Sequence, residues 1–447
     1  MKKSLIALAA LAATSAFAQS SVTLYGRAEA GVDLGYRATT SNSTSTVFTP
    51  VAGAVVATNA GGAGAVAKPG FRIQDGNNQG LGSSRFGMRG TEDLGGGLKA
   101  NFVMEAGLNL DDGSTGNGGG NFFSRSAWVG LSGGFGEVRL GRQVLGSFAV
   151  HANGLVNGSA SGLYETGTTM AQGGVRFSNA IQYRSSDFGG ISGTVSLSAP
   201  ENRTDGGATT TAPATRTSGD KIGIDLSVAY ANGPIYVGFG YNKKNKSTTI
   251  NNGLAGGANV ITDSSGPRTD YTISASYNFG VAQPFFNYTN RKDRTSSSIT
   301  TGGVFASTNS TLLGTPAAPA SASAFAIPAN QDALDSLNTN GRQYALGVKV
   351  PLGAATLVTS FGTHKTTGSV TNAANTATDS VQRKVRAFQV GGFYPLSKRT
   401  TLMANYGFND QKDNVVNSTT TILGNTVTNS AREIKVRGLN VGVQHLF

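Results

Sequence analysis

The sequence predicts an all-β fold, a closed antiparallel barrel of sixteen strands that spans a membrane. Three observations support this prediction. Apolar and polar residues alternate with a period of two along many segments, as in strands with one apolar and one hydrated face. The connections between these segments alternate between tight turns and long loops. The last strand alternates in the same way and ends the chain on an aromatic residue, Phe447.

The composition fits such a barrel. Gly is abundant, with 63 residues, charged residues make up 13%, and there are no cysteines. A chain so rich in small polar residues could be disordered, but its 22 Phe and 13 Tyr occupy alternating positions. Half of each barrel strand faces water, which lowers the mean hydropathy. No apolar run outside the N-terminus approaches the ~20 residues of a membrane-spanning helix.

The first eighteen residues predict a signal peptide. Lys2 and Lys3 form a basic start, an apolar run covers Leu5 to Ala13, and Ala16-Phe17-Ala18 matches a cleavage site. We therefore expect residues 1–18 to be removed and residues 19–447 to form the barrel, with Gln19 at the mature N-terminus.

The first predicted strand runs from Val22 to about Tyr36 and is followed by a long segment to about Gly80. Seven tight turns then pair the following strands, and each turn contains Gly or a polar cluster. They fall at residues 93–97, 133–136, 189–190, 232–233, near 280, at 353 and at 397–399. Eight long segments join the hairpins, so fifteen connections link sixteen strands. Both chain termini of the barrel are then expected on the short-turn side, which is periplasmic in outer-membrane barrels.

A barrel of this size must enclose water. In hydrocarbon every backbone amide needs a partner, which only closure of the sheet provides. The inward residues are Ser, Thr, Asn, Gly and charged groups, and sixteen strands enclose a lumen too wide for side chains to fill. The long segment from Gln143 to Phe177 has no strand periodicity. We expect it to fold inward and narrow this lumen.

Several short runs give the chain a resemblance to the general diffusion porins of Gram-negative outer membranes. These runs are Leu24-Tyr25-Gly26-Arg27, Ser83-Ser84-Arg85-Phe86-Gly87, Gly141-Arg142-Gln143, Phe177-Ser178-Asn179, Tyr183-Arg184-Ser185 and Gly442-Val443-Gln444-His445-Leu446-Phe447. The resemblance covers nearly the whole mature chain. It implies a trimer in the outer membrane, a third long loop folded into the pore, and passive diffusion of small hydrophilic solutes and ions. The Pro-Glu-Phe-Gly-Gly motif of enteric porins is missing here.

By the same resemblance, the pore constriction is expected to contain four arginines facing one loop acid. The predicted set is Arg27, Arg85, Arg125, Arg184 and Glu165. Weaker lumen candidates are Arg89, Lys99, Glu29, Glu105 and Arg142. The alternative is that these are simply solvated wall residues, but clustered like charges repel by roughly 0.5–1 kcal/mol per pair, a cost that structure alone does not require. A ring of permanent guanidinium charges predicts a weak preference for anions.

The predicted partners are outer-membrane lipid and two further copies of the chain. Small residues on strands one, two and four are expected to face outward and suit subunit contact, with Trp128 at the seam. These residues are Ala28, Ala30, Ser84, Ser124, Ser126 and Gly130. No nucleic acid, cofactor or metal is expected.

Two other functions stay open at this stage. An outer-membrane barrel enzyme would need a nucleophile or paired carboxylates beside a histidine, and none of His151, His364 and His445 has such a neighbour in sequence. A substrate-specific channel for sugars would need a track of inward aromatic residues, and only Tyr25, Tyr236 and Phe393 qualify. A phosphate channel would need lysines in the third loop, which contains none.

Overall fold

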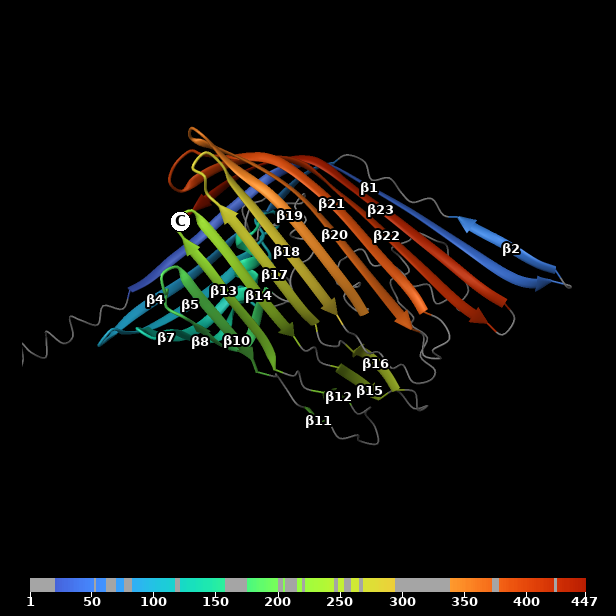
Figure 1. Ribbon diagram of the computed structural model, residues 1–447, viewed down its shortest axis with the longest axis horizontal. Helices are drawn as coiled ribbons and strands as arrows, with labels where there is room; N and C mark the ends of the chain where they lie inside the picture. Colours follow the sequence, from blue (N-terminus) through green and yellow to red (C-terminus); the bar gives the residue numbers. More distant parts are fainter. Residues whose placement is uncertain are drawn as a thin grey trace, which may run out of the picture.

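A computed structural model shows a closed antiparallel β-barrel of sixteen strands with one short helix, α2 (Gly146–Asn153), among the residues it describes. The strands cross the barrel obliquely (Figure 1). The described residues are 21–447 except 52–53, 62–69, 76–82, 117–120, 157–174, 200–203, 206–214, 219–221, 245–247, 253–258, 265–267, 294–337, 372–377 and 422–423.

Each barrel strand pairs with the next along the chain, and β23 pairs back with β1. The sixteen strands are β1 (Ser21–Val51), β4 (Arg85–Gly95), β5 (Leu98–Leu108), β7 (Ser126–Gly133), β8 (Gly136–Val144), β9 (Arg176–Arg184), β10 (Ile191–Ser198), β13 (Gly223–Asn232), β14 (Ile235–Lys244), β17 (Arg268–Tyr277), β18 (Gln283–Asp293), β19 (Asn338–Leu352), β20 (Ala355–Thr371), β21 (Thr378–Pro395), β22 (Thr400–Thr421) and β23 (Gly424–Leu446).

All seven predicted tight turns join the strands as expected. The turn between β13 and β14 holds Gly233 at φ 54°, and that between β19 and β20 holds Gly353 at φ 61°. Both values lie in the left-handed region, where glycine carries no steric penalty. Local turn chemistry therefore sets the hairpin register from the short-turn end of the barrel.

The barrel closes where the first and last strands meet. β1 pairs with β23 from Arg27 opposite Leu446 to Val47 opposite Thr426. The terminal residue completes the seam, because the Phe447 amide donates to the Gly26 carbonyl at 3.1 Å and the Gly26 amide donates to the Phe447 carbonyl at 2.9 Å. A Cβ on Gly26 would lie 2.2 Å from the Phe447 ring, so this position needs glycine.

The strands extend further than the sequence pattern indicated. β1 continues to Val51 instead of ending near Tyr36, and β20 to β23 contain 17, 18, 22 and 23 residues. Hydrophobic alternation marks only the part of a strand that lies in lipid, since beyond it both faces meet water. Shorter strands add to the sheet, namely β2 (Ala54–Gly61), β3 (Gly70–Asp75) and β6 (Thr115–Gly116). A separate four-stranded sheet consists of β11 (Thr204–Asp205), β12 (Thr215–Ser218), β15 (Thr248–Asn252) and β16 (Asn259–Ser264).

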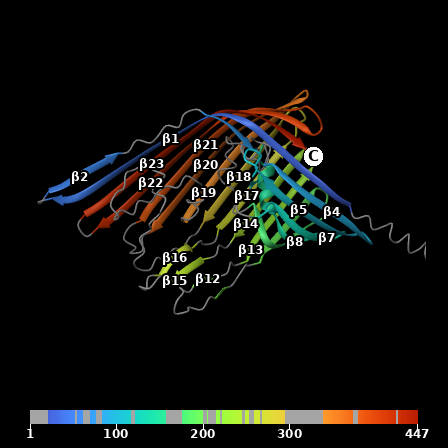
Figure 2. The same ribbon diagram turned by 180° about the vertical axis from the view of Figure 1, so that it is seen from behind.

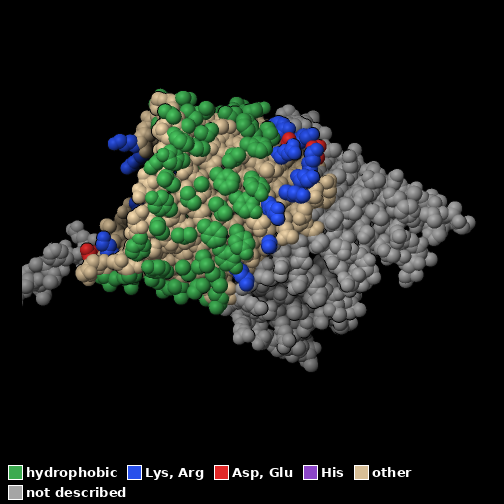
Figure 3. Space-filling model, in the orientation of Figure 1, with side chains coloured by type: hydrophobic (Ala, Val, Ile, Leu, Met, Phe, Trp, Pro, Cys, Tyr) green, Lys and Arg blue, Asp and Glu red, His purple; other side chains and the backbone are tan. Residues whose placement is uncertain are grey.

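Apolar side chains cover the outside of the barrel, as the alternation predicts. Hydrophobic residues spread over the strand surface in Figure 3. On β13 and β14 the exposed residues include Leu226, Val228, Val237 and Phe239. No helix in the described residues has the length and apolar character to cross a membrane.

The inside of the barrel is polar. Ser196, Asn287, Thr289 and Gln389 are fully buried on the inward face. Two small apolar clusters interrupt this surface where the segment after β8 touches the wall. One contains Leu145, Phe148, Phe177 and Ala180, and the other Val156, Phe285, Val358 and Phe393.

Candidate functional site

The described start of the segment after β8, residues 145–156, folds into the barrel and docks on the inner wall. Most of the predicted inward loop, residues 157–174, lies outside the described residues. Helix α2 is anchored at its start by Asp225 of β13, a fully buried carboxylate. Asp225 accepts hydrogen bonds from the Ser147 amide at 3.2 Å, from the Ser147 hydroxyl, and from the Asn242 side chain at 3.2 Å. A negative charge at the first turn of a helix also complements the helix dipole.

A second set of contacts holds the other end of α2. The His151 ring bonds to the Thr289 hydroxyl at 3.0 Å, and the Asn287 side chain donates to the His151 carbonyl at 3.3 Å. Glycine allows the close approach beyond this point, because a Cβ on Gly347 would lie 1.9 Å from Val156. α2 is thus fixed to β13, β14, β17 and β18.

The wall facing α2 is the one formed by β1, β4, β5 and β7. In the ring of sixteen strands β14 stands eight places from β1, β17 eight from β4, and β18 eight from β5. Figure 2 shows β4, β5, β7 and β8 side by side from behind. The lumen at this level lies between α2 and these strands.

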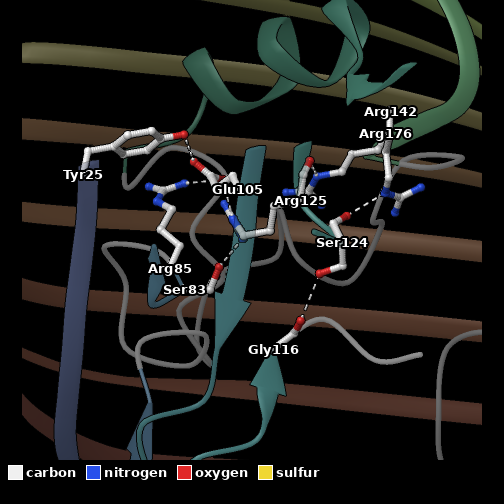
Figure 4. A network of polar contacts seen from close by, with 9 residues as sticks. All are labelled: Tyr25, Ser83, Arg85, Glu105, Gly116, Ser124, Arg125, Arg142 and Arg176. Carbon is white, nitrogen blue, oxygen red and sulfur yellow. Dashed lines mark hydrogen bonds and ion pairs between the residues drawn. The ribbon is translucent and has the colours of Figure 1, made fainter. Parts of the chain in front are cut away.

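A cluster of charged residues on this facing wall is organised around Glu105 of β5. The Arg125 Nε donates to Glu105 Oε1 at 2.6 Å, and Arg85 Nη1 lies 3.8 Å from the same oxygen. The Tyr25 hydroxyl donates to Glu105 Oε2 at 3.0 Å, and Arg125 Nη1 donates to the Ser83 hydroxyl at 2.6 Å. Figure 4 shows Tyr25, Arg85 and Arg125 converging on this carboxylate.

Two more arginines extend the cluster on the far side of Arg125. Arg142 Nε donates to the Ser124 carbonyl and its Nη1 to the Ser178 hydroxyl, each at 2.6 Å. Arg176 Nε donates to the Arg125 carbonyl at 2.6 Å (Figure 4). These acceptors orient the guanidinium groups without neutralising their charge.

Arg27 of β1 joins the same group. It pairs in register with Arg85 and lies within electrostatic range of Arg125 and Glu105. Glu29, two residues along β1, is fully buried and accepts from the Gln444 side chain at 2.8 Å. Five arginines from β1 to β9 therefore surround Glu105 and Glu29, and two further buried carboxylates, Asp33 and Asp75, lie on β1 and β3. The arginines outnumber these acids. We call the five residues Arg27, Arg85, Arg125, Arg142 and Arg176 the arginine cluster.

The structure groups the predicted site residues differently from the sequence prediction. Arg184 is exposed at the short-turn end of β9, opposite Glu137 in register and within electrostatic range of Arg139, instead of beside Arg85 and Arg125. The Arg89 guanidinium carbon lies 5.3 Å from the centroid of the Tyr25 ring. Lys99 is exposed beside the turn between β4 and β5. Glu165 lies outside the described residues.

The expected outward wall of small residues is right for Ala28 and Ala30, which share the face of exposed Val22 and Leu24 on β1, but it is wrong on β7. Ser126 stands opposite Glu105 and Gly130 opposite Arg139, so both share the inward face. Ser84 and Ser124 are buried, and Ser84 is hydrogen-bonded to the Glu29 backbone. Trp128 lies on this inward face under Arg139, whose guanidinium carbon is 4.1 Å from the ring. Arg125 lies in a bend just before β7, and both its side chain and Ser126 face Glu105, so the alternation shifts by one residue there.

Sequence reasoning missed Arg176. The signal was present, because Arg176 directly precedes Phe177-Ser178-Asn179, one of the runs that carry the resemblance. Among the described residues, no group of His, Cys, Asp and Glu could hold a metal ion.

Comparisons with known proteins give a consistent result. The family model described as Gram-negative porin matches residues 4–414. Outer membrane porin protein 32 of Delftia acidovorans is 37% identical over 63% of this chain and 68% of its own length. An outer membrane porin protein of Bordetella pertussis is 29% identical over 91% of this chain and 94% of its own length.

Solved structures share the fold. An anion-selective porin from Comamonas acidovorans has a TM-score of 0.55 and 24% identity, covering 96% of this chain and 100% of that one. A loop-deletion form of OmpT from Vibrio cholerae has a TM-score of 0.51 and 12% identity, covering 96% and 99%.

Proposed function

The chain belongs to the Gram-negative porin family of the outer membrane, and on that premise we propose that it forms a water-filled channel that favours anions. Small hydrophilic solutes and ions diffuse passively between helix α2 and the arginine cluster. The observation that carries the proposal is the excess of guanidinium groups around Glu105. The anion selectivity named for the Comamonas acidovorans porin supports it.

Electrostatics explains why such a cluster would select anions. Guanidinium groups stay protonated at physiological pH, so their charge is permanent. Low-dielectric walls focus the field of the cluster into the lumen, which raises the local concentration of anions and lowers that of cations. Glu105 offsets part of this charge and holds Arg85 and Arg125 in place, which supports a weak preference.

A salt gradient tests the proposed selectivity. With purified protein in a planar bilayer, we expect the reversal potential in a KCl gradient to have the sign for chloride. The preference should decrease at high salt, since the Debye length falls from ~10 Å at 0.1 M to ~3 Å at 1 M. A clear potassium preference would overturn the proposal.

A substrate-specific channel is the second candidate, and two contacts argue against it. Tyr25 is engaged with Glu105, and Phe393 packs against the apolar cluster of Val156, so the inward aromatic residues do not form a sugar track. A specific channel would show current block that saturates with sugar or phosphate, whereas a general pore would not. Kinship with porins likewise supports a channel and no enzymatic activity.

We further propose that residues 1–18 are removed on export and that the mature chain forms a trimer. The shortest of the sixteen barrel strands, β7 to β10, form one side of the barrel and carry exposed Val129, Leu131 and Leu140. A wall of this kind suits contact between subunits related by a threefold axis. We expect a multimer in mild detergent that dissociates to monomers on boiling. Monomeric behaviour before heating would contradict this assignment.

A further inference from the structure

A row of basic residues runs around the outside of the barrel on the long-loop side. The register places Arg342, Lys365, Lys384 and Lys412 directly opposite one another across β19, β20, β21 and β22. All four are exposed and share the outward face with Phe361 and Tyr344. Neighbouring outward positions add further cations. We call the set the basic band: Lys292, Arg342, Lys365, Lys384, Arg386, Lys412, Lys435 and Arg437.

The basic band borders the apolar surface. Figure 3 shows Lys and Arg side chains in a row along the edge of the hydrophobic region. An aromatic girdle lies just inside this edge, with the ring pairs Tyr288–Tyr344 at 4.9 Å and Phe388–Phe408 at 5.9 Å. Aromatic girdles mark the membrane–water interface of outer-membrane barrels. The band lies two to four residues beyond it, or about 7–13 Å, which is the level of lipid headgroups.

The charges of the basic band are balanced only at one end. Glu433 pairs with Lys412 and Lys435, and Asp410 pairs with Arg437. Arg386 stands opposite Asp410 in register. Within the described part of the chain, no ion pair involves Arg342, Lys365 or Lys384, which stand opposite one another. Like charges directly opposite across strands are destabilising. Repulsion between these cations therefore destabilises the barrel, and a bound external anion would relieve that repulsion.

We propose that the basic band binds the phosphate groups of a phosphorylated glycolipid in the outer leaflet of the outer membrane. The band spans six strands, β18 to β23, or roughly 24 Å, which matches several headgroup phosphates better than one free ion. Its continuity with the girdle and the apolar surface lets the acyl chains pack below while the phosphates meet the cations. Basic residues at a membrane surface recognise anionic lipid in this way.

Lipid binding by paired variants tests the proposal. Lys365→Ser with Lys384→Ser removes two opposed charges of the band. The control, Lys398→Ser with Arg399→Ser, removes two exposed charges at the short-turn rim. Binding of labelled diphosphoryl lipid A to the purified protein in nonionic detergent should weaken by about thirtyfold in the first variant and stay within twofold in the control. Lipid A stripped of its phosphates should bind wild type no better than diphosphoryl lipid A binds the first variant.

Each contrary result has a defined meaning. Equal weakening in both variants, or none in either, would overturn the proposal, and so would equal binding of the phosphate-free lipid. Displacement of lipid A by low-millimolar inorganic phosphate would assign the band to a free anion instead. Channel conductance and β-sheet circular dichroism should be unchanged in both variants, so that a folding defect is distinguished from lost lipid binding.

Discussion

Replacing both Arg85 and Arg125 with serine is expected to lower the chloride-to-potassium permeability ratio by roughly tenfold in dilute KCl. A unit charge ~5 Å from a passing ion contributes about 0.8 kcal/mol in water, and two such charges act together here. The loss also leaves Glu105 without the two arginines that pair with it, so an uncompensated carboxylate remains in the lumen. Reversal potentials in a KCl gradient measure the ratio, and a value equal to wild type would contradict the proposed role of these arginines.

A companion variant separates the loss of the two guanidinium charges from the effect of the uncompensated Glu105 carboxylate. Adding Glu105→Gln to the double substitution removes the stranded carboxylate, so part of the chloride preference should return. The remaining difference from wild type then reports the two guanidinium charges alone. The Tyr25 hydroxyl can still donate to the glutamine carbonyl oxygen, so the wall keeps one of its contacts.

A matched control uses charges of the same sign on the same inward face. Arg184→Ser with Lys99→Ser removes two exposed cations near the short turns, away from Arg125. Because water and salt screen these positions, the permeability ratio should change by less than about twofold. An effect as large as that of the first variant would mean that selectivity arises along the whole lumen and not at the cluster.

The contrast between Arg184 and Arg176 shows how far the sequence predicts the site. Alternation identifies which residues face inward, and it places Arg85 and Arg184 on that face correctly. It gives no information on height along the barrel, which depends on strand tilt and on the stagger between strands. The cluster also depends on backbone irregularities at Arg125 and near Gly141, where the register between β8 and β9 shifts. A period of two cannot anticipate such a shift.

The fold itself was predictable because its signals are local. Each tight turn contains its own glycine or polar residues, and each lipid-facing strand shows its own alternation. Helix α2 gave no such signal. Its buried face consists of Ser147, Val150 and His151, a mixture of polar and apolar residues without a hydrophobic stripe. The helix is determined by partners 78 and 138 residues away in the chain, Asp225 and Thr289.

Replacing Asp225 with alanine is expected to release α2 and widen the channel. Hydrogen bonds to a charged carboxylate contribute about 1.5–3 kcal/mol each, and Ser147 donates two of them. Relief from burying a charge offsets part of this loss. We expect the undocked population to rise roughly tenfold to a hundredfold, with a larger, noisier single-channel conductance. Liposome swelling should show passage of larger neutral sugars than in wild type.

Two further variants identify the cause of such widening. Asp413→Ala removes an equally buried wall carboxylate that pairs with Arg383 on β21, away from α2, and should leave the sugar cutoff unchanged. Ser147→Ala removes the hydroxyl partner from the helix side. Because Ser147→Ala and Asp225→Ala disrupt the same contact, their effects on the cutoff should be less than additive when combined. Strict additivity would mean that Asp225 acts on the lumen through its charge and not by holding the helix, since only a shared contact couples the two substitutions.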